Sequence, residues 1–153
     1  MESNGIHIRL RLVVIKKGKV LVQYRQKPNF YHYIGGHLEI GETLLDGCVR
    51  ETAEECNGAR FNFKKILYIR DFFDPMKNGE QSLELFILGD INKFKELEHH
   101  YDPEHTEQDV WCTWLDLENL PDNLFPHALS KKILMDYKNS FLKEGEYLGR
   151  MDK

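Results

Sequence analysis

Residues 35–58 read GGHLEIGETLLDGCVRETAEECNG and carry the strongest structural signal in the chain. The run 44–56 has the apolar spacing of a helix. Thr43 is a suitable N-cap, and Asp46, three residues later, completes an imperfect capping box. The Asn-Gly pair at 57–58 tolerates the left-handed conformation that ends a helix. The stretch therefore predicts a glycine-containing loop followed by a helix with defined ends.

Residues of this helix lie about 100° apart around its axis, so the sequence divides into an apolar face and an acidic face. The apolar face, which we expect to lie on the core, comprises Leu45, Cys48, Val49, Thr52 and Cys56. Glu51, Glu54 and Glu55 share the acidic face, and Arg50 precedes Glu54 by one helical turn. Like charges at this spacing repel one another. A solvated helix face would carry such a cluster, and so would a metal site.

The loop before the helix favours the metal site. Gly35 and Gly36 have no Cβ, so their backbone can approach a ligand closely. Glu42 lies in the loop that enters the helix, where it is placed to hold that loop. Loop carbonyls and helix carboxylates are hard oxygen ligands, which suit Mg²⁺ or Mn²⁺ better than Zn²⁺. Cations held there would bridge substrate phosphates and activate a water molecule.

The spacing of these residues resembles the Nudix box, GX5EX7REUXEEXGU, in which U is a bulky aliphatic residue. The matching positions are Gly36, Glu42, Arg50, Glu51, Glu54 and Glu55. Every charged position of the motif is present at the required spacing. The flanking segments VLVQYR and WLDLENL are also similar to those of the family, so the resemblance extends over residues 6–134.

The resemblance implies an α+β fold, a Nudix-like α/β/α sandwich with a mixed central sheet. It also implies a MutT-like, Mg²⁺-dependent pyrophosphohydrolase that acts on acid anhydrides. Such an enzyme cleaves the pyrophosphate linkage in a nucleoside diphosphate linked to another moiety, by attack of water on phosphorus. A catalytically silent nucleotide-sensing or binding domain is the alternative, which the intact acids disfavour. A structural protein with an acidic helix is a third alternative.

Carried over by position, the resemblance assigns roles to the residues of the box. The metal ligands would be Glu51, Glu54, Glu55 and the backbone carbonyl of Gly35. Arg50 would orient the glutamates by salt bridges as part of the catalytic group. Gly36 and Glu42 would brace the loop.

The general base varies within the family between a box glutamate and an acid on a later loop. The loop candidates are Glu104, Glu107 and Asp109, which precede the predicted strand 110–115. Of these we expect Glu107 to be the catalytic base. Glu84 is a further candidate, as an outer metal ligand. For each of these acids the alternative is a solvated charge.

Three positions depart from the family pattern. Ile34 stands where many members have proline, and Thr52 stands where a bulky aliphatic residue is usual. The pair 57–58 replaces the final glycine and aliphatic residue of the motif. None of these changes removes a charged group, and asparagine can still end the helix.

Arg25 ends the predicted strand 19–25, where family members often place a substrate-binding basic residue. We expect Tyr31 and Tyr33 to stack on a nucleotide base. Stacking of this kind contributes about 1–3 kcal/mol per base in proteins that bind single strands. Packing of both tyrosines in the core or on the surface is the alternative.

The rest of the chain predicts a mixed sheet with helices against it. Further strands are expected at 6–15, 30–38, 61–73 and 83–88, and a polar loop at 93–106. Pro126–Leu142 is predicted to form a second helix, with Leu129, Ile133, Tyr137 and Phe141 on one stripe. The tail 144–153 is expected to be frayed.

The chain of 153 residues has the length of one domain, so we expect a single domain over 1–153 with its core at about 6–142. Its net charge of −4, from 25 acids and 21 bases, argues against a DNA partner. It does not exclude a nucleotide-type small-molecule substrate, because metal ions neutralise phosphates. A monomer or a homodimer is expected.

No apolar run approaches the roughly 20 residues of a membrane span. Residues 1–5 are polar and have no signal-peptide apolar region. The three cysteines, Cys48, Cys56 and Cys112, form no CxxC pair and are expected to be buried reduced thiols. We therefore expect a cytoplasmic protein without a membrane partner.

Overall fold

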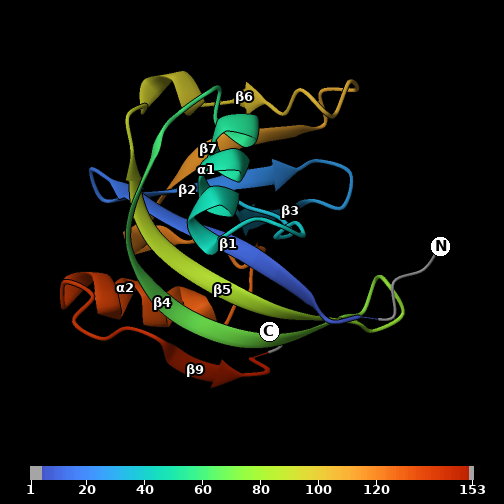
Figure 1. The fold of residues 1–153 in the computed structure, drawn as a ribbon. Helices are drawn as coiled ribbons and strands as arrows, with labels where there is room; N and C mark the ends of the chain where they lie inside the picture. Colours follow the sequence, from blue (N-terminus) through green and yellow to red (C-terminus); the bar gives the residue numbers. More distant parts are fainter. Residues whose placement is uncertain (1–4, 152–153) are drawn as a thin grey trace.

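The computed structural model describes residues 5–151, in which nine strands form one mixed sheet (Figure 1). The strands are β1 (His7–Lys16), β2 (Lys19–Arg25), β3 (Phe30–Tyr33), β4 (Phe61–Asp74), β5 (Glu80–Ile91), β6 (His100–Tyr101), β7 (Val110–Asp116), β8 (Leu124–Phe125) and β9 (Glu146–Gly149). Their order is β6-β7-β2-β1-β5-β4-β9, with β3 between β2 and β8. The pairs β1–β5, β3–β8 and β4–β9 are parallel, and the other pairs are antiparallel. The predicted mixed sheet is confirmed.

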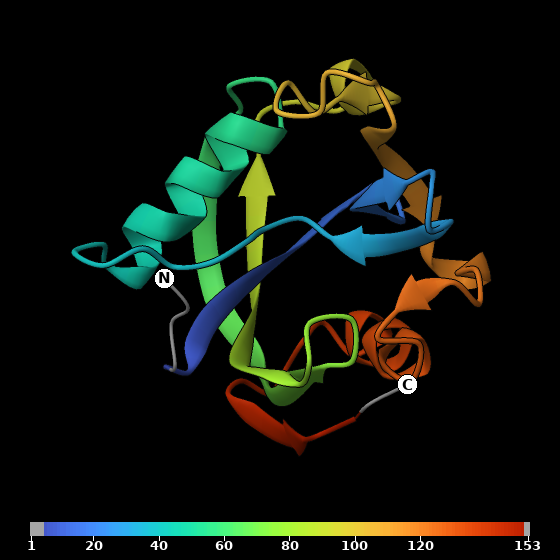
Figure 2. The same ribbon diagram turned by 90° about the vertical axis from the view of Figure 1, so that its right-hand side faces the viewer.

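Two α-helices cover opposite faces of the sheet, α1 (Leu44–Glu55) on one side and α2 (Leu129–Lys138) on the other (Figures 1 and 2). Each helix covers a hydrophobic core on its side of the sheet. Neighbouring side chains of β1 point into different cores, because side chains alternate along a strand. Leu12 packs in the core under α1, and Val13 packs in the core under α2. The predicted α/β/α sandwich is therefore confirmed.

The ends of α1 agree with the sequence. Thr43 accepts a hydrogen bond from the backbone N–H of Asp46, and the Asp46 carboxylate accepts one from the backbone N–H of Thr43. This is a complete capping box. Asn57 and Gly58 have φ values of 52° and 72°, which end the helix as predicted.

The buried face of α1 differs from the expected one. Cys48, Thr52 and Cys56 are buried, but Leu45 and Val49 are 50% and 44% exposed. The helix is rotated so that Glu51 and Glu55 lie inward instead. The structure therefore buries part of the acidic face, for which the sequence left a solvated face and a metal site as the alternatives.

The second helix is shorter than predicted. It begins at Leu129 and ends at Lys138, after which Ser140 and Phe141 adopt left-handed φ values of 59° and 49°. Leu129, Ile133 and Phe141 are buried as the stripe predicts, while Tyr137 is 38% exposed.

The expectation of a frayed tail is wrong for the residues that the structure describes, and the core extends beyond residue 142. Strand β9 pairs with β4, and the backbone N–H of Gly145 donates to the carbonyl of Ile66 (2.9 Å). Nε of the buried Arg70 donates to the carbonyls of Arg150 and Met151 at 3.2 and 3.0 Å. Backbone pairing, which leaves little trace in an apolar pattern, holds this segment. Residues 152–153 of the predicted tail lie outside the described residues.

All three cysteines are free and buried, as expected. No helix within residues 5–151 combines the length and the apolar content needed to cross a bilayer. The polar segment 1–5, predicted to lack a signal peptide, lies outside the described residues except for Gly5.

Truncation after Glu144 tests the role of β9. We expect the free energy of unfolding to fall by about 1–3 kcal/mol, because the buried guanidinium of Arg70 loses its carbonyl acceptors. Urea unfolding followed by circular dichroism measures the change. The control is Leu142→Ala, which alters a side chain that is 82% exposed. Equal unfolding midpoints for the truncated and full-length chains would contradict this role of β9.

Candidate active site

The glycine loop that precedes α1 lies along β1. The backbone N–H of Leu12 donates to the carbonyl of Ile34, and that of Leu10 donates to the carbonyl of Gly36, both at 2.7 Å. Gly35 has a φ of 136°, and a Cβ there would lie 2.0 Å from the carbonyl oxygen of Leu10. Only glycine fits this position, so the loop is fixed against the central strand.

Gly36 allows a carboxylate to approach the loop. A Cβ on Gly36 would lie 2.7 Å from Oε1 of Glu51, whose residue is 7% exposed. The missing side chain therefore makes room for the first glutamate of the helix. The sequence predicted that a ligand could come close to the backbone of the glycine pair. At Gly36 the group that comes close is the carboxylate of Glu51.

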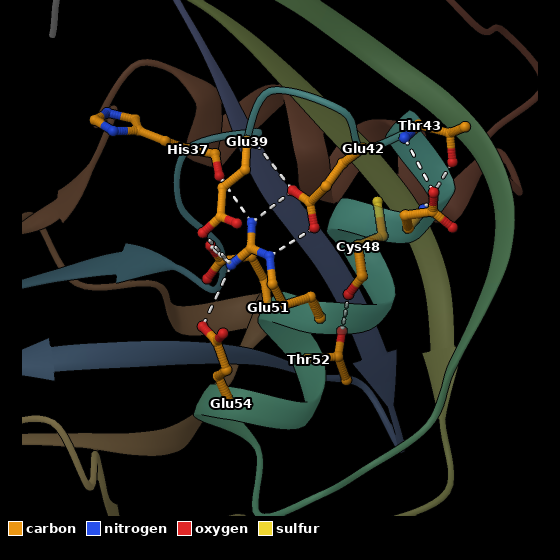
Figure 3. A network of polar contacts seen from close by, with 10 residues as sticks. His37, Glu39, Glu42, Thr43, Cys48, Glu51, Thr52 and Glu54 are labelled. Atoms are coloured by element: carbon orange, nitrogen blue, oxygen red, sulfur yellow. Dashed lines mark hydrogen bonds and ion pairs between the residues drawn. The ribbon is translucent and has the colours of Figure 1, made fainter.

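Arg50 joins the loop to the helix through hydrogen bonds with both. Figure 3 shows the carboxylates of its partners Glu42, Glu51 and Glu54 gathered between the loop and the helix. Its Nε and Nη2 donate to the two carboxylate oxygens of Glu42 at 2.7 and 2.9 Å, and Nη2 also donates to the carbonyl of His37 at 3.0 Å. Its Nη1 donates to Glu51 at 2.9 Å and to Glu54 at 3.3 Å. The hydrogen bonds with Glu42 raise the pKa of Arg50 and lower the pKa of Glu42. Both groups of the pair are therefore charged at neutral pH.

Glu42 also holds the loop backbone. Its Oε1 accepts a hydrogen bond from the backbone N–H of Glu39 at 2.9 Å. One carboxylate thus connects the loop at Glu39 with the guanidinium of Arg50. This is the geometry that bracing of the loop requires.

Glu55 is the most unusual carboxylate of the helix. Its residue is 8% exposed, and its Oε1 has no hydrogen-bond partner among the residues that the structure describes. Burial, followed by hydrogen bonding and repulsion from Glu51, raises the pKa of Glu55 well above its ordinary value. A buried acceptor without a partner destabilises the protein unless a ligand satisfies it. Glu55 is therefore suited to receive a ligand.

A cavity of about 460 Å³ lies in front of these groups. The predicted site residues that line it are Arg25, Gly35, Gly36, Arg50, Glu51, Glu54 and Glu55. Glu42 is not among the lining residues and holds Arg50 instead. The structure thus brings together most of the predicted residues.

The opposite wall contains residues that the sequence did not single out. Gln23 of β2 donates to Oδ2 of Asp102 at 3.0 Å, and Oδ1 of Asp102 accepts the backbone N–H of Glu104 at 2.9 Å. Gln23 lies two residues before Arg25, so strand periodicity places both on one face and was the available signal. Asp102 lies in an irregular polar loop, where no periodic pattern marks it.

Three acids named from the sequence, Glu107, Asp109 and Glu84, do not line the cavity. Glu107 is exposed and forms an ion pair with Lys27, which also faces Asp109 at 3.7 Å. It does not line the cavity, whereas Glu104 does. Glu84 is buried in ion pairs with Arg11 and Arg70, outside the cavity lining. Loop geometry, which the sequence does not specify, separates Glu104 from Glu107.

Neither of the two tyrosines that we expected to stack on a nucleotide base lines the cavity. Tyr33 is fully buried, and its ring packs edge-on against Phe86 at 5.7 Å. Tyr31 packs against Tyr24 at 4.7 Å and lies on the α2 side of the sheet. Both side chains lie on the face of β3 opposite to His32, with the core under α2.

A second group of possible ligands lies at the start of β1. Ligand atoms of His7, His37 and Glu80 lie within 4.8 Å of one another. Nη2 of Arg9 lies 3.1 Å from Nε2 of His37, where its guanidinium donates to the imidazole lone pair. A cation at this position would face that positive charge, so the group carries no metal assignment.

Comparison with known proteins identifies the fold family. A family model of the NUDIX domain matches residues 7–137. The chain belongs to the NUDIX family. This family consists of hydrolases that act on nucleoside diphosphate derivatives. A search of curated proteins finds no match.

Solved structures of NUDIX hydrolases share the fold. A NUDIX hydrolase from Nitrosomonas europaea has a TM-score of 0.69 at 13% identity, covering 97% of this chain and 80% of its own. A UDP-X diphosphatase has a TM-score of 0.67 at 15% identity, covering 96% and 68%. An ADP-ribose pyrophosphatase from Streptococcus suis has a TM-score of 0.63 at 16% identity, covering 95% and 99%. At these identities the likeness shows the fold.

The NUDIX helix and loop present a donor set that fits a hard divalent cation. Glu51, Glu54 and Glu55 supply carboxylate oxygens, and Gly35 lies at the same cavity wall. The buried oxygen of Glu55 is the direct sign of a fit, because a cation would provide the partner that the described part of the chain does not. Oxygen ligands of this kind suit Mg²⁺ or Mn²⁺.

Glu55→Gln tests this fit by thermal unfolding with and without MgCl₂. Wild-type protein is expected to gain about 2.7 kcal/mol at a hundredfold excess of Mg²⁺ over its Kd. The variant is expected to be at least as stable as wild type without Mg²⁺, because it removes a carboxylate whose ionisation is disfavoured, and to lose the Mg²⁺-induced gain. The control is Glu118→Gln, an exposed position paired with Lys138. An undiminished Mg²⁺ response in Glu55→Gln would contradict the assignment.

Proposed function

We propose that this NUDIX protein hydrolyses the pyrophosphate linkage in a nucleoside diphosphate linked to another moiety, with Mg²⁺ as cofactor and Mn²⁺ as an alternative. The observation that carries the proposal is the unpartnered buried oxygen of Glu55, in a cavity that Glu51 and Glu54 also line. No group within residues 5–151 is a hydrogen-bond partner of this oxygen, and a divalent cation would supply one.

The proposal gives each residue of the helix and loop a task. The groups that would hold the cation are Glu51, Glu54, Glu55 and the carbonyl of Gly35. When bound, the cation lowers the pKa of water and neutralises charge on phosphate oxygens. Arg50 orients Glu51 and Glu54 through its hydrogen bonds, and Glu42 holds Arg50 in place. Gly36 provides the space that Glu51 occupies.

We assign the general base to Glu104 rather than to Glu107. Glu104 lines the cavity, and Asp102 fixes its backbone. Its carboxylate would accept the proton that water loses as it attacks phosphorus, while the bond from phosphorus to the leaving oxygen breaks. Glu107 is engaged with Lys27 outside the cavity.

Arg25 is the proposed phosphate contact. It lines the same cavity as the box glutamates, and its guanidinium, unlike that of Arg50, forms no ion pair with them. A UDP-X diphosphatase and an ADP-ribose pyrophosphatase among the similar structures support a nucleoside diphosphate derivative as the substrate class.

Three buried free thiols suit a reducing compartment, which supports the cytoplasm as the location. The net charge of −4 supports small nucleotides rather than DNA as partners. A monomer or a homodimer is proposed.

Glu54→Gln tests the proposed function. Wild-type protein is assayed with Mg²⁺ or Mn²⁺ against ADP-ribose, nucleotide sugars, nucleoside triphosphates, dinucleoside polyphosphates and capped RNA, and the products are identified. We expect turnover of at least one substrate, and a fall of about 100-fold in Glu54→Gln because a cation ligand is lost.

The matched control is again Glu118→Gln, which we expect to keep wild-type turnover. Full activity of Glu54→Gln would contradict the metal site. Binding of nucleotides by the wild type with no turnover of any substrate would favour the silent binding domain.

A paired comparison tests the general base. We expect Glu104→Gln to lower kcat by about 100-fold or more, within the range of acid–base catalysis. Glu107→Gln is expected to retain near wild-type kcat, because that side chain faces Lys27 outside the cavity. Steady-state kinetics on the best substrate measures both. A large loss confined to Glu107→Gln would return the base role to that residue.

A further inference from the structure

His32 lies beside the catalytic cavity with its side chain between two arginines. It belongs to β3, is 9% exposed, and pairs in register with Gln23, which lines the cavity. Arg11 approaches it from β1 and Arg25 approaches it from β2. A histidine buried between two positive charges requires an explanation, because both disfavour its protonated form.

The hydrogen bonds of His32 determine its tautomer. Nδ1 lies 2.8 Å from the carbonyl oxygen of Tyr33, which can only accept, so Nδ1 carries the proton. Nε2 then has a free lone pair, and Nε of Arg25 donates to it at 3.0 Å. Nη1 of Arg11 also donates to the Tyr33 carbonyl, at 3.4 Å. Burial, Arg11 and Arg25 together lower the pKa of His32, in agreement with a neutral ring.

This contact orients Arg25 without neutralising it. A carboxylate in place of His32 would form an ion pair with the guanidinium and cancel much of its charge. The neutral imidazole instead binds Nε and fixes the plane of the guanidinium. Within the part of the chain that the structure describes, no carboxylate lies within ion-pair distance of Arg25. Its two terminal amino groups therefore keep their hydrogen-bonding capacity for a ligand.

We propose that His32 is a positioning residue that directs Arg25 toward an anionic oxygen of the substrate diphosphate. The inference rests on the proposed function, because it assumes a phosphate-containing ligand in the cavity. It adds that the fixed tautomer of His32, set by Tyr33, determines how Arg25 binds that ligand.

Two substitutions of His32 test the roles of its two ring nitrogens separately. Gln at position 32 places an amide oxygen near the position of Nε2 and can accept from Arg25. Asn at position 32 places its amide near the position of Nδ1, so it can donate to Tyr33 but leaves Arg25 without an acceptor. The experiment titrates ADP in the presence of Mg²⁺ into wild type, His32→Gln, His32→Asn and Arg25→Ala by calorimetry. Thermal unfolding confirms that each variant is folded.

We expect His32→Asn and Arg25→Ala each to weaken ADP binding by about tenfold. His32→Gln is expected to stay within about twofold of wild type. The double variant His32→Asn/Arg25→Ala is expected to bind as Arg25→Ala does, because His32 acts through Arg25. Equal effects of Gln and Asn on Kd, or independent effects in the double variant, would overturn the inference. Unchanged Kd values with lowered thermal stability would show a structural role only and would also overturn it.

Because the readout is binding, failure of the proposed function is distinguishable from failure of this inference. If wild-type protein turns over no substrate but the variants show the expected ADP pattern, the proposed hydrolysis fails and the role of His32 stands. If wild-type protein is active but the pattern is absent, the role of His32 alone fails. Absence of ADP binding by the wild type overturns the inference.

Discussion

The forked ion pair between Arg50 and Glu42 is the interaction on which the site depends. Exposed ion pairs contribute about 0–1 kcal/mol, but these side chains are only 21% and 16% exposed and share two parallel hydrogen bonds. The pair joins a loop to a helix, and Arg50 extends the connection to the carbonyl of His37. Without it, the glycine loop would keep its backbone hydrogen bonds to β1 and the packing of Leu38 on the helix, but would lose its ion pair to the helix that carries the carboxylates. The guanidinium of Arg50 is therefore the polar link between the loop and the helix carboxylates.

The charge balance around that guanidinium explains why the site is suited to a cation. Arg50 donates to Glu42, Glu51 and Glu54, so one positive charge faces three carboxylates. Glu55 adds a fourth, buried carboxyl, which responds by a raised pKa. Protonation relieves this repulsion but supplies no partner for the buried Oε1 among the described residues. A divalent cation would relieve the repulsion between the carboxylates and also bind the free oxygen of Glu55. The crowded acids of α1 destabilise the protein without a ligand, and a bound cation would stabilise it.

Patterns among neighbouring residues predicted the ends of α1 correctly. Features that depend on tertiary packing were not predicted. The capping box at Thr43 and the stop at Asn57 depend on neighbouring residues, and the structure has both. Hydrophobic periodicity predicted that Leu45 lies in the core. In the structure α1 is rotated about its axis, so that Leu45 is half exposed and Glu51 and Glu55 lie inward. Glu107 was separated from Glu104 by the course of an irregular loop, for which the sequence offers no periodic signal. Tyr33 was assigned to the site although strand alternation carries it into the core under α2.

The proposed function requires positive charge for phosphate and negative charge for a cation in one cavity, without the two cancelling. In the structure, Asp102 and Arg25 form hydrogen bonds with neutral groups. Asp102, which lines the same cavity, is satisfied by the amide of Gln23 and the backbone of Glu104. Arg25 is satisfied at Nε by a neutral imidazole. Arg25 and Asp102 are thus each oriented by neutral groups, so that their charges stay available to groups that enter the cavity.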